Sequence, residues 1–214
     1  ELPDLPRVGR SDPARSLHLM TFLADLRQVL RSRDFRRLFG TRLLAQTSDG
    51  IFQVALASYV FFSPERQPSA SAVAVAFAAL LLPYSLVGPF AGVLLDRWRR
   101  RQVLVWANVI RAVMVLGVGS LVLAGTEGPV FYASALAVLS VNRFFLAGLS
   151  AALPHVVANS ELIMANSVST TSGTVAAVIG GSIGYLARTL FGDDSGGTAG
   201  ILCLAALTYL LSAL

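Results

Sequence analysis

Long apolar segments follow one another through most of this chain, and they restrict its fold more than any other feature. They run over about residues 39–62, 70–95, 103–124, 130–153 and 162–190, and a sixth covers 199–214. A helix needs roughly 20 apolar residues to cross a bilayer, and the first five segments exceed that length. Hydrophobic residues make up 55% of the chain and charged residues 14%, which is too apolar for a soluble domain of this size. The pattern predicts an all-α integral membrane protein with six spans in a lipid bilayer.

The two ends of the chain carry separate expectations. Residues 1–37 are rich in Pro and Arg, and a helical stripe is formed there by Leu19, Leu23, Leu26 and Leu30. This part predicts a cytoplasmic tail followed by a basic amphipathic helix on the membrane surface, with the six-helix bundle over residues 38–214. Because the chain does not begin with Met and its sixth segment is short, we expect an excerpt of a longer protein that is cut inside the sixth span.

The basic residues indicate how the spans are oriented. All 17 are arginine; nine lie at or before Arg42 and four more between Arg97 and Arg101, so 13 flank one side of the predicted bundle. Basic residues are enriched in cytoplasmic loops, which places the N-terminus and the Arg97 loop in the cytoplasm of a multi-pass plasma membrane protein. The same rule accounts for the basic character of the chain, so no nucleic acid partner is expected.

One of these loops has a distinctive order of residues. The pattern consists of Gly92, Leu94, Asp96, Arg97, Arg100 and Arg101. It resembles the signature loop between the second and third helices of the major facilitator superfamily, although Arg99 stands where that family usually has glycine. The resemblance implies the N-terminal six-helix half of a 12-span transporter, built from two three-helix inverted repeats, whose partner is a missing C-terminal six-helix half. It also implies that the loop latches the two halves in one state. The alternative is a plain arginine cluster that stops translocation.

Further matches resemble one branch of that superfamily, the exporters of macrolides and of siderophores such as enterobactin. They are the residues 34–39, 48–50 and 162–167. The branch implies a secondary active transporter that exports small hydrophobic or amphipathic compounds in exchange for protons. This chain departs from the superfamily's antiporter motif at Ala177, where that motif has a proline.

Asp49 is the acidic residue placed deepest in the predicted spans. It follows Phe39 by ten residues, which is roughly 15 Å along a helix and near the bilayer centre. A carboxylate at that depth costs at least about 2.5–3.5 kcal/mol unless it faces a partner or a cavity. The same side of the helix carries Arg42, Gln46 and Gln53, so this polar stripe is expected to line the bundle interior. It predicts a site that binds substrate or takes up a coupling proton. The alternative is a structural ion pair with an arginine.

Two arginines are the other charged residues near the middle of a predicted span. They are Arg111, with Asn108 one turn before it, and Arg143, and they are the candidate partners for Asp49 from other spans. In the antiporters that the chain resembles, a fourth-span arginine takes part in proton coupling, and Arg143 stands near that place. Two arginines against one aspartate leave an excess of positive charge, which either a carboxylate of the missing half balances or an anionic substrate uses. Alternatively, each arginine bonds backbone carbonyls or extends to the membrane surface.

Small residues form a second stripe, in the fifth apolar segment. It consists of Gly173, Ala177, Gly180 and Gly184, at steps of four, three and four. Small side chains at this spacing let two helices approach closely. The stripe predicts either static helix packing or a surface on which the halves of a transporter slide.

Other activities lack a sequence signal. His18 and His155 have no second ligand at metal-binding spacing, and the chain contains no phosphate-binding loop. We therefore expect no enzyme, no metal and no cofactor. Two alternatives to proton-coupled export stay open: an importer or facilitator of lipids or anions with the same fold, and a membrane scaffold that transports nothing.

Overall fold

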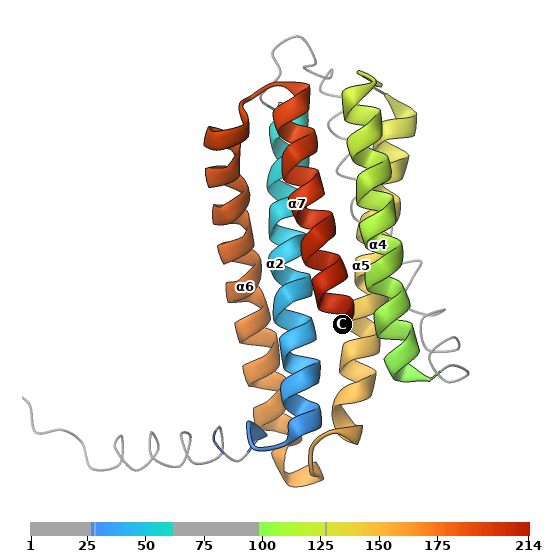
Figure 1. Cartoon of the computed structure of the whole chain (residues 1–214). Coiled ribbons are helices and arrows are strands. Elements are labelled where there is room, and N and C mark those ends of the chain that lie inside the picture. Colours follow the sequence, from blue (N-terminus) through green and yellow to red (C-terminus); the bar gives the residue numbers. More distant parts are fainter. Residues whose placement is uncertain (1–26, 28, 62–98, 127) are drawn as a thin grey trace, which may run out of the picture.

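The computed structural model of this chain describes residues 27, 29–61, 99–126 and 128–214, and every regular element in that part is helical. The long helices lie alongside one another in a single bundle (Figure 1). They are α2 (Arg33–Phe61), α4 (Arg100–Leu123), α5 (Pro129–Ala152), α6 (Leu162–Phe191) and α7 (Ser195–Ala213). The prediction of an all-α protein is confirmed. The predicted span at residues 70–95 and most of the predicted tail and surface helix lie outside the described residues.

The helices alternate in direction. Helices α2, α4 and α6 run one way, and α5 and α7 run back (Figure 1). Helix α2 packs on α6 and on α7, α7 packs on α4, and α4 packs on α5. Two short 3-10 helices, η2 (Leu153–His155) and η3 (Asn159–Glu161), connect α5 to α6. Helices α2 and α7 therefore occupy the middle of the bundle.

Four described helices are long and apolar enough to cross a membrane. They span Arg101–Leu123, Pro129–His155, Asn159–Phe191 and Ser195–Ala213. Helix α2 is not among them, because polar residues along it, including Gln46, Asp49 and Gln53, lower its mean hydropathy. Since α2 packs against α6 and α7, other helices rather than lipid surround much of it. A polar helix is tolerated in a membrane at such an interior position.

Helix α2 begins earlier than the apolar pattern predicts. The hydroxyl oxygen of Ser32 accepts a hydrogen bond from the backbone N–H of Phe35 (3.3 Å), which caps the helix at this point. The same hydroxyl donates to the backbone oxygen of Val156 (3.0 Å), so the cap also ties α2 to the turn after α5. Residues 33–37 are consequently the first turn of α2 and not the end of a separate surface helix.

Helix α7 also begins earlier than expected. The sequence predicts an acidic loop up to Gly197 and a span from Ala199, whereas the helix starts at Ser195. Its cap is Asp194, whose carboxylate accepts a hydrogen bond from the backbone N–H of Gly197 (2.8 Å). Aspartate is a favourable N-cap because it satisfies a backbone N–H that has no partner within the helix.

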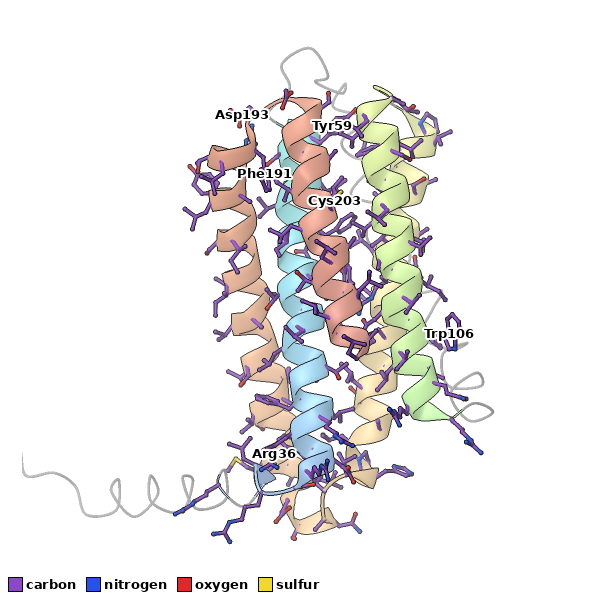
Figure 2. The ribbon with its side chains drawn as sticks, in the orientation of Figure 1. Arg36, Tyr59, Trp106, Phe191, Asp193 and Cys203 are labelled. Carbon is purple, nitrogen blue, oxygen red and sulfur yellow. The ribbon has the colours of Figure 1, made fainter. Side chains whose placement is uncertain are left out.

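Two apolar regions lie at opposite ends of the bundle. The larger joins α2, α4, α5, α6 and α7 and includes Phe52, Val115 and Phe131. It extends toward Tyr59, near the end that carries Asp193 (Figure 2). A smaller cluster contains Val29, Phe35, Leu153 and Ala165 and lies at the other end, which carries Arg36. The polar residues described next are buried near the middles of α2, α4 and α5.

Candidate functional site

An ion pair joins the centres of two helices. The Nη1 atom of Arg111 lies 3.0 Å from Oδ1 of Asp49, and the two side chains are 0% and 4% exposed. Asp49 lies near the middle of α2, and Arg111 near the middle of α4. Both charges are thus removed from water. In the protein interior the attraction between them is much stronger than at a surface. The predicted interior placement of both residues agrees with this geometry.

Two further helices contribute to the pair. The hydroxyl of Tyr209 on α7 donates a hydrogen bond to Oδ1 of Asp49. Arg111 also donates to the side-chain oxygens of Asn142 on α5 (3.0 Å) and of Asn108 on its own helix. We call Asp49, Arg111, Asn108, Asn142 and Tyr209 the central cluster. Four helices therefore meet at one carboxylate and one guanidinium.

Aromatic rings enclose the guanidinium of Arg111. Its central carbon lies 4.2 Å from the centroid of the Phe145 ring and 4.4 Å from that of the Tyr209 ring. Ring faces attract a cation, and this attraction grows when water is excluded. Arg111 is therefore held by the rings as well as by the carboxylate of Asp49.

The central cluster is not fully hydrogen-bonded. Among the described residues, neither Oδ2 of Asp49 nor Nε of Arg111 has a hydrogen-bond partner. A buried polar atom without a partner costs about 1–3 kcal/mol, so the arrangement is not optimised for stability alone. The free carboxylate oxygen is an atom at which Asp49 could bind a proton without first breaking a hydrogen bond.

A chain of neutral groups extends the central cluster toward the Arg36 end. The amide nitrogen of Asn108 donates to the hydroxyl of Ser212 (2.8 Å), which donates to the backbone oxygen of Thr41 (2.8 Å). On the same helices, the hydroxyl of Ser48 donates to the backbone oxygen of Ala205. These bonds connect α2, α4 and α7 around the central cluster.

A second polar group lies between α2 and α6, and we call it the Arg42 group. Nε of Arg42 donates to Oε1 of Gln46 (3.4 Å), and Nη1 donates to the hydroxyl of Ser169 (3.1 Å). Arg42 is only 9% exposed. The predicted stripe on α2 therefore divides between two groups, with Asp49 in one and Arg42 and Gln46 in the other.

Two predicted site residues lie outside both groups. Gln53 is exposed, so the expectation that it lines the packed interior is wrong for the described bundle. Gln53 is the last member of the polar stripe along α2, and it lies on the same side of the helix as Asp49. Arg143 is half-buried on α5, and its charge acts on Asp49.

The sequence did not identify Tyr209, Asn142 or Ser212 as members of the site. A signal was present for Tyr209, because a tyrosine inside an apolar span needs a partner for its hydroxyl. No signal showed that this partner is Asp49, since 160 positions separate the two residues. Asn142 stands beside Arg143, and only the rotation of α5 shows which of the two contacts Arg111.

The small-residue stripe of α6 faces α2. A Cβ atom added at Gly180 would lie 2.7 Å from the backbone carbon of Thr47, and one added at Gly184 would lie 3.3 Å from the Cα of Ile51. On α2, a Cβ added at Gly50 would collide with the backbone oxygen of Ala177 and lie 2.6 Å from the backbone nitrogen of Gly181. The remaining member, Gly173, adjoins the Arg42 group. The two backbones are therefore in direct contact.

The predicted latch loop is largely outside the described residues. This applies to Gly92, Asp96 and Arg97. Arg100 is the first residue of α4, and Arg101 follows it with an exposed side chain. The role of the loop stays a prediction.

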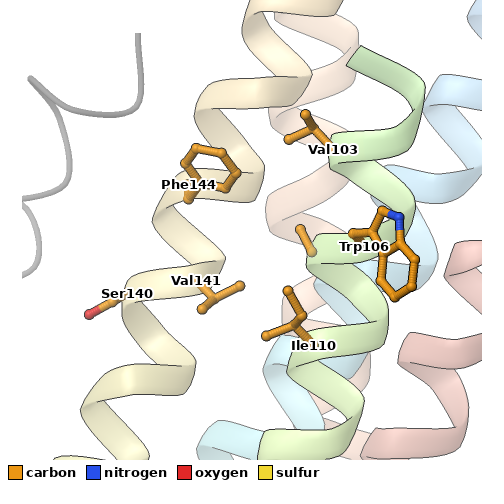
Figure 3. Close-up of a pocket in the computed structure, with 7 residues that line it drawn as sticks. Val103, Trp106, Ile110, Ser140, Val141 and Phe144 are labelled. Atoms are coloured by element: carbon orange, nitrogen blue, oxygen red, sulfur yellow. The ribbon is translucent and has the colours of Figure 1, made fainter. Parts of the chain in front are cut away.

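A groove of about 280 Å³ opens between α4 and α5 (Figure 3). Its lining residues are Val103, Trp106, Ala107, Ile110, Ser140, Val141 and Phe144. None of these described lining residues is charged, so they offer mainly apolar contact. No group of three or more His, Cys, Asp or Glu that could hold a metal occurs in the part of the chain that the structure describes.

Membrane-length helices around a buried ion pair define a multi-pass membrane protein with a charged centre, an arrangement typical of transporters. Comparison with known families gives the class more narrowly. The family model described as Major Facilitator Superfamily matches residues 38–214, so the chain belongs to the Major Facilitator Superfamily. It therefore belongs to a transporter family and not to an enzyme family.

The chain is similar to curated mycobacterial proteins. It is 44% identical over 181 residues to proteins of Mycobacterium tuberculosis and Mycobacterium bovis, each named an uncharacterized MFS-type transporter. These alignments cover 85% of this chain and 41% of the relatives. An uncharacterized protein of Mycobacterium leprae is 30% identical over 143 residues, which are 62% of this chain and 24% of that protein. No solved structure matches. The chain thus spans about two fifths of the length of the M. tuberculosis and M. bovis relatives.

Proposed function

We propose that the whole protein is a secondary active transporter that exports small hydrophobic or amphipathic compounds in exchange for protons. The observation that carries this proposal is the Asp49–Arg111 ion pair, which is buried where four helices meet. Intramembrane ionisable residues are costly, and transporters use them for substrate binding and proton transfer. The narrower relation to macrolide and siderophore exporters is part of this proposal.

The central cluster suggests how a proton would act. In the paired state, the carboxylate of Asp49 holds Arg111 on α4 and Tyr209 on α7. A proton on Asp49 removes its negative charge, so its attraction for Arg111 falls and α2 is held less tightly to α4 and α7. The backbone contact between α2 and α6 contains no titratable group and would persist. Proton binding would therefore allow α2 and α6 to move together relative to α4 and α7.

The helix packing supports two inverted three-helix repeats. If α2 and α5 are the first helices of the repeats, then α4 and α7 are the third. The contact of α2 with α7 then corresponds to the contact of α5 with α4, and both occur. The contact between α4 and α7 relates the two third helices to each other. We propose that this bundle is the N-terminal half of a 12-span fold, and that substrate binds between it and a C-terminal half.

The orientation belongs to the same proposal. Arginines gather at the Arg36 end of the bundle, and the opposite end carries Asp193 (Figure 2). Basic residues are enriched on the cytoplasmic side, so we place the N-terminus and the start of α4 in the cytoplasm of the plasma membrane. The proposed latch, formed by the Gly92–Arg101 loop, would act on that side.

The test is transport by the full-length protein in vesicles with an imposed pH gradient. We expect Asp49→Asn to abolish movement driven by the gradient, while Asp49→Glu retains part of it. Asp34→Asn is the matched control, because Asp34 is an exposed acid in the first turn of the same helix. Unchanged gradient-driven transport in Asp49→Asn would refute the proton role. Gradient-independent uptake would favour the facilitator, and no transport of any tested compound by wild type would favour the scaffold.

A further inference from the structure

Arg42 is a buried charge that the proposed proton site does not use. It follows the start of α2 by nine residues, which is roughly 14 Å along the helix, and it is 9% exposed. No described carboxylate forms an ion pair with it; Asp49, two turns further along α2, is paired with Arg111. A guanidinium removed from water to this extent is costly without a counter-charge. Its position therefore calls for an anion that the described bundle does not supply.

The neighbours of Arg42 orient its guanidinium without neutralising it. Gln46 and Ser169 accept hydrogen bonds from Nε and Nη1, and both are uncharged. Among the described side chains, Nη2 has no acceptor. The hydroxyl of Ser169 uses an oxygen lone pair for Arg42, so its hydrogen remains available to donate. Two donors, Nη2 and this hydroxyl, are left for a ligand.

The space for this arrangement depends on Gly173. A Cβ atom added there would collide with Oε1 of Gln46 and lie 2.8 Å from Nε of Arg42. Gly173 lies one turn after Ser169 on α6, so the same helix supplies both the gap and an acceptor. A larger residue at this position would force the side chains of Gln46 and Arg42 to shift.

We propose that Arg42, together with Ser169, binds the carboxylate or phosphate group of the compound that the protein transports. A guanidinium matches the planar geometry of an oxyanion and can donate two hydrogen bonds to it. The inference rests on the proposed function and narrows its substrate to amphipathic anions. The proton on Asp49 and the anion at Arg42 would then occupy neighbouring positions on one helix.

Binding of charged compounds to the purified full-length protein tests this inference. The probes are hexanoate, hexyl phosphate and hexylammonium, which share one apolar chain and differ in charge. We expect the two anions, and not the cation, to stabilise the protein against heat. In Arg42→Gln, the dissociation constants of the anions should rise about 10–100-fold, as expected for loss of a charged hydrogen bond. Arg37→Gln, which removes an exposed arginine of the same helix, should leave them unchanged.

Other results overturn the inference. Equal binding of hexylammonium and hexanoate would do so, as would wild-type affinity for anions in Arg42→Gln. If only phosphatidylglycerol vesicles showed the Arg42 effect, the ligand would be a lipid headgroup and not a transported solute. Should Arg42→Gln fail to fold, Ser169→Ala keeps the charge and is expected to weaken anion binding by a few fold. Binding needs no pH gradient, so a negative result leaves the Asp49 transport test standing, and failure of that test leaves the binding result intact.

Discussion

The two sides of helix α2 are held by different physics. Toward α6, backbone lies on backbone through Gly50, Gly180 and Gly184, and the Arg42 group adds hydrogen bonds to uncharged side chains. Toward α4 and α7, the contact centres on the Asp49–Arg111 ion pair. Close packing depends on shape and is indifferent to protons, whereas the ion pair is lost when one proton binds. We therefore infer that α2 and α6 form a rigid pair, and that the contact of α2 with α4 and α7 is the one that proton binding can weaken.

Removing one partner of the ion pair should give the largest loss of stability. Arg111→Leu leaves the carboxylate of Asp49 buried without its counter-charge, and breaking a buried pair in this way costs about 3–5 kcal/mol. Denaturation of the purified full-length protein in mixed detergent micelles measures the change. The control is the double variant Asp49→Asn with Arg111→Gln, which removes both charges and leaves polar side chains that can bond each other. It should recover at least half of the loss. Equal destabilisation of the single and double variants would show that the charges do not matter to this side of α2.

The α6 side should respond to added volume instead. Gly180→Ala places a Cβ atom 2.7 Å from the backbone carbon of Thr47, and a backbone cannot rotate away as a side chain can. Overpacking of this kind typically costs about 1–3 kcal/mol. The same denaturation measurement applies. We expect the pH dependence of transport to match that of the wild type, because Asp49 is held on the other side of α2 by Arg111 and Tyr209. A shifted pH dependence would contradict the separation of the two sides.

The sequence predicted the helical class and the central charge more readily than the partners. Apolar length was enough for the four described helices that can cross a membrane, because it follows from the thickness of a bilayer. Asp49 and Arg111 were found because deep charges are rare and must meet. Gln53 was misplaced because a helical stripe shows which residues share a side of the helix. It does not show how far along that side the neighbouring helices cover them.

Local chemistry explains the misplaced boundaries. Polar caps at Ser32 and Asp194 start α2 and α7 before the apolar residues begin, and hydropathy does not register them. The contact of Tyr209 with Asp49 spans most of the chain, so it depends on how α7 packs between α2 and α4. The sequence contained the residues of the central cluster, but only the packing shows which of them touch.

The hydroxyl of Tyr209 should contribute less than either charge. Tyr209→Phe removes one hydrogen bond to Asp49 and keeps the ring that lies 4.4 Å from the guanidinium carbon of Arg111. A single hydrogen bond is worth about 0.5–1.5 kcal/mol net, so we expect a loss of about 1 kcal/mol in the same denaturation measurement. Tyr209→Leu, which also removes the ring, should cost more. Identical values for the two variants would mean that the ring does not stabilise Arg111.

Gly181→Ala should have the smallest effect, although it changes the residue next to Gly180 on the same helix. A Cβ added at Gly181 meets only Cγ2 of Val54 at 3.5 Å and the backbone oxygen of Gly50 at 4.0 Å, which are ordinary contacts. Alanine also loses less backbone entropy in a helix than glycine, a gain of roughly 0.5–1 kcal/mol that offsets any small repulsion. We therefore expect the free energy of unfolding to stay within about 0.5 kcal/mol of wild type or to rise slightly. If Gly181→Ala destabilised the protein as much as Gly180→Ala, the cost would come from replacing any glycine of α6. The backbone contact with α2 would then not be what makes the two helices a rigid pair.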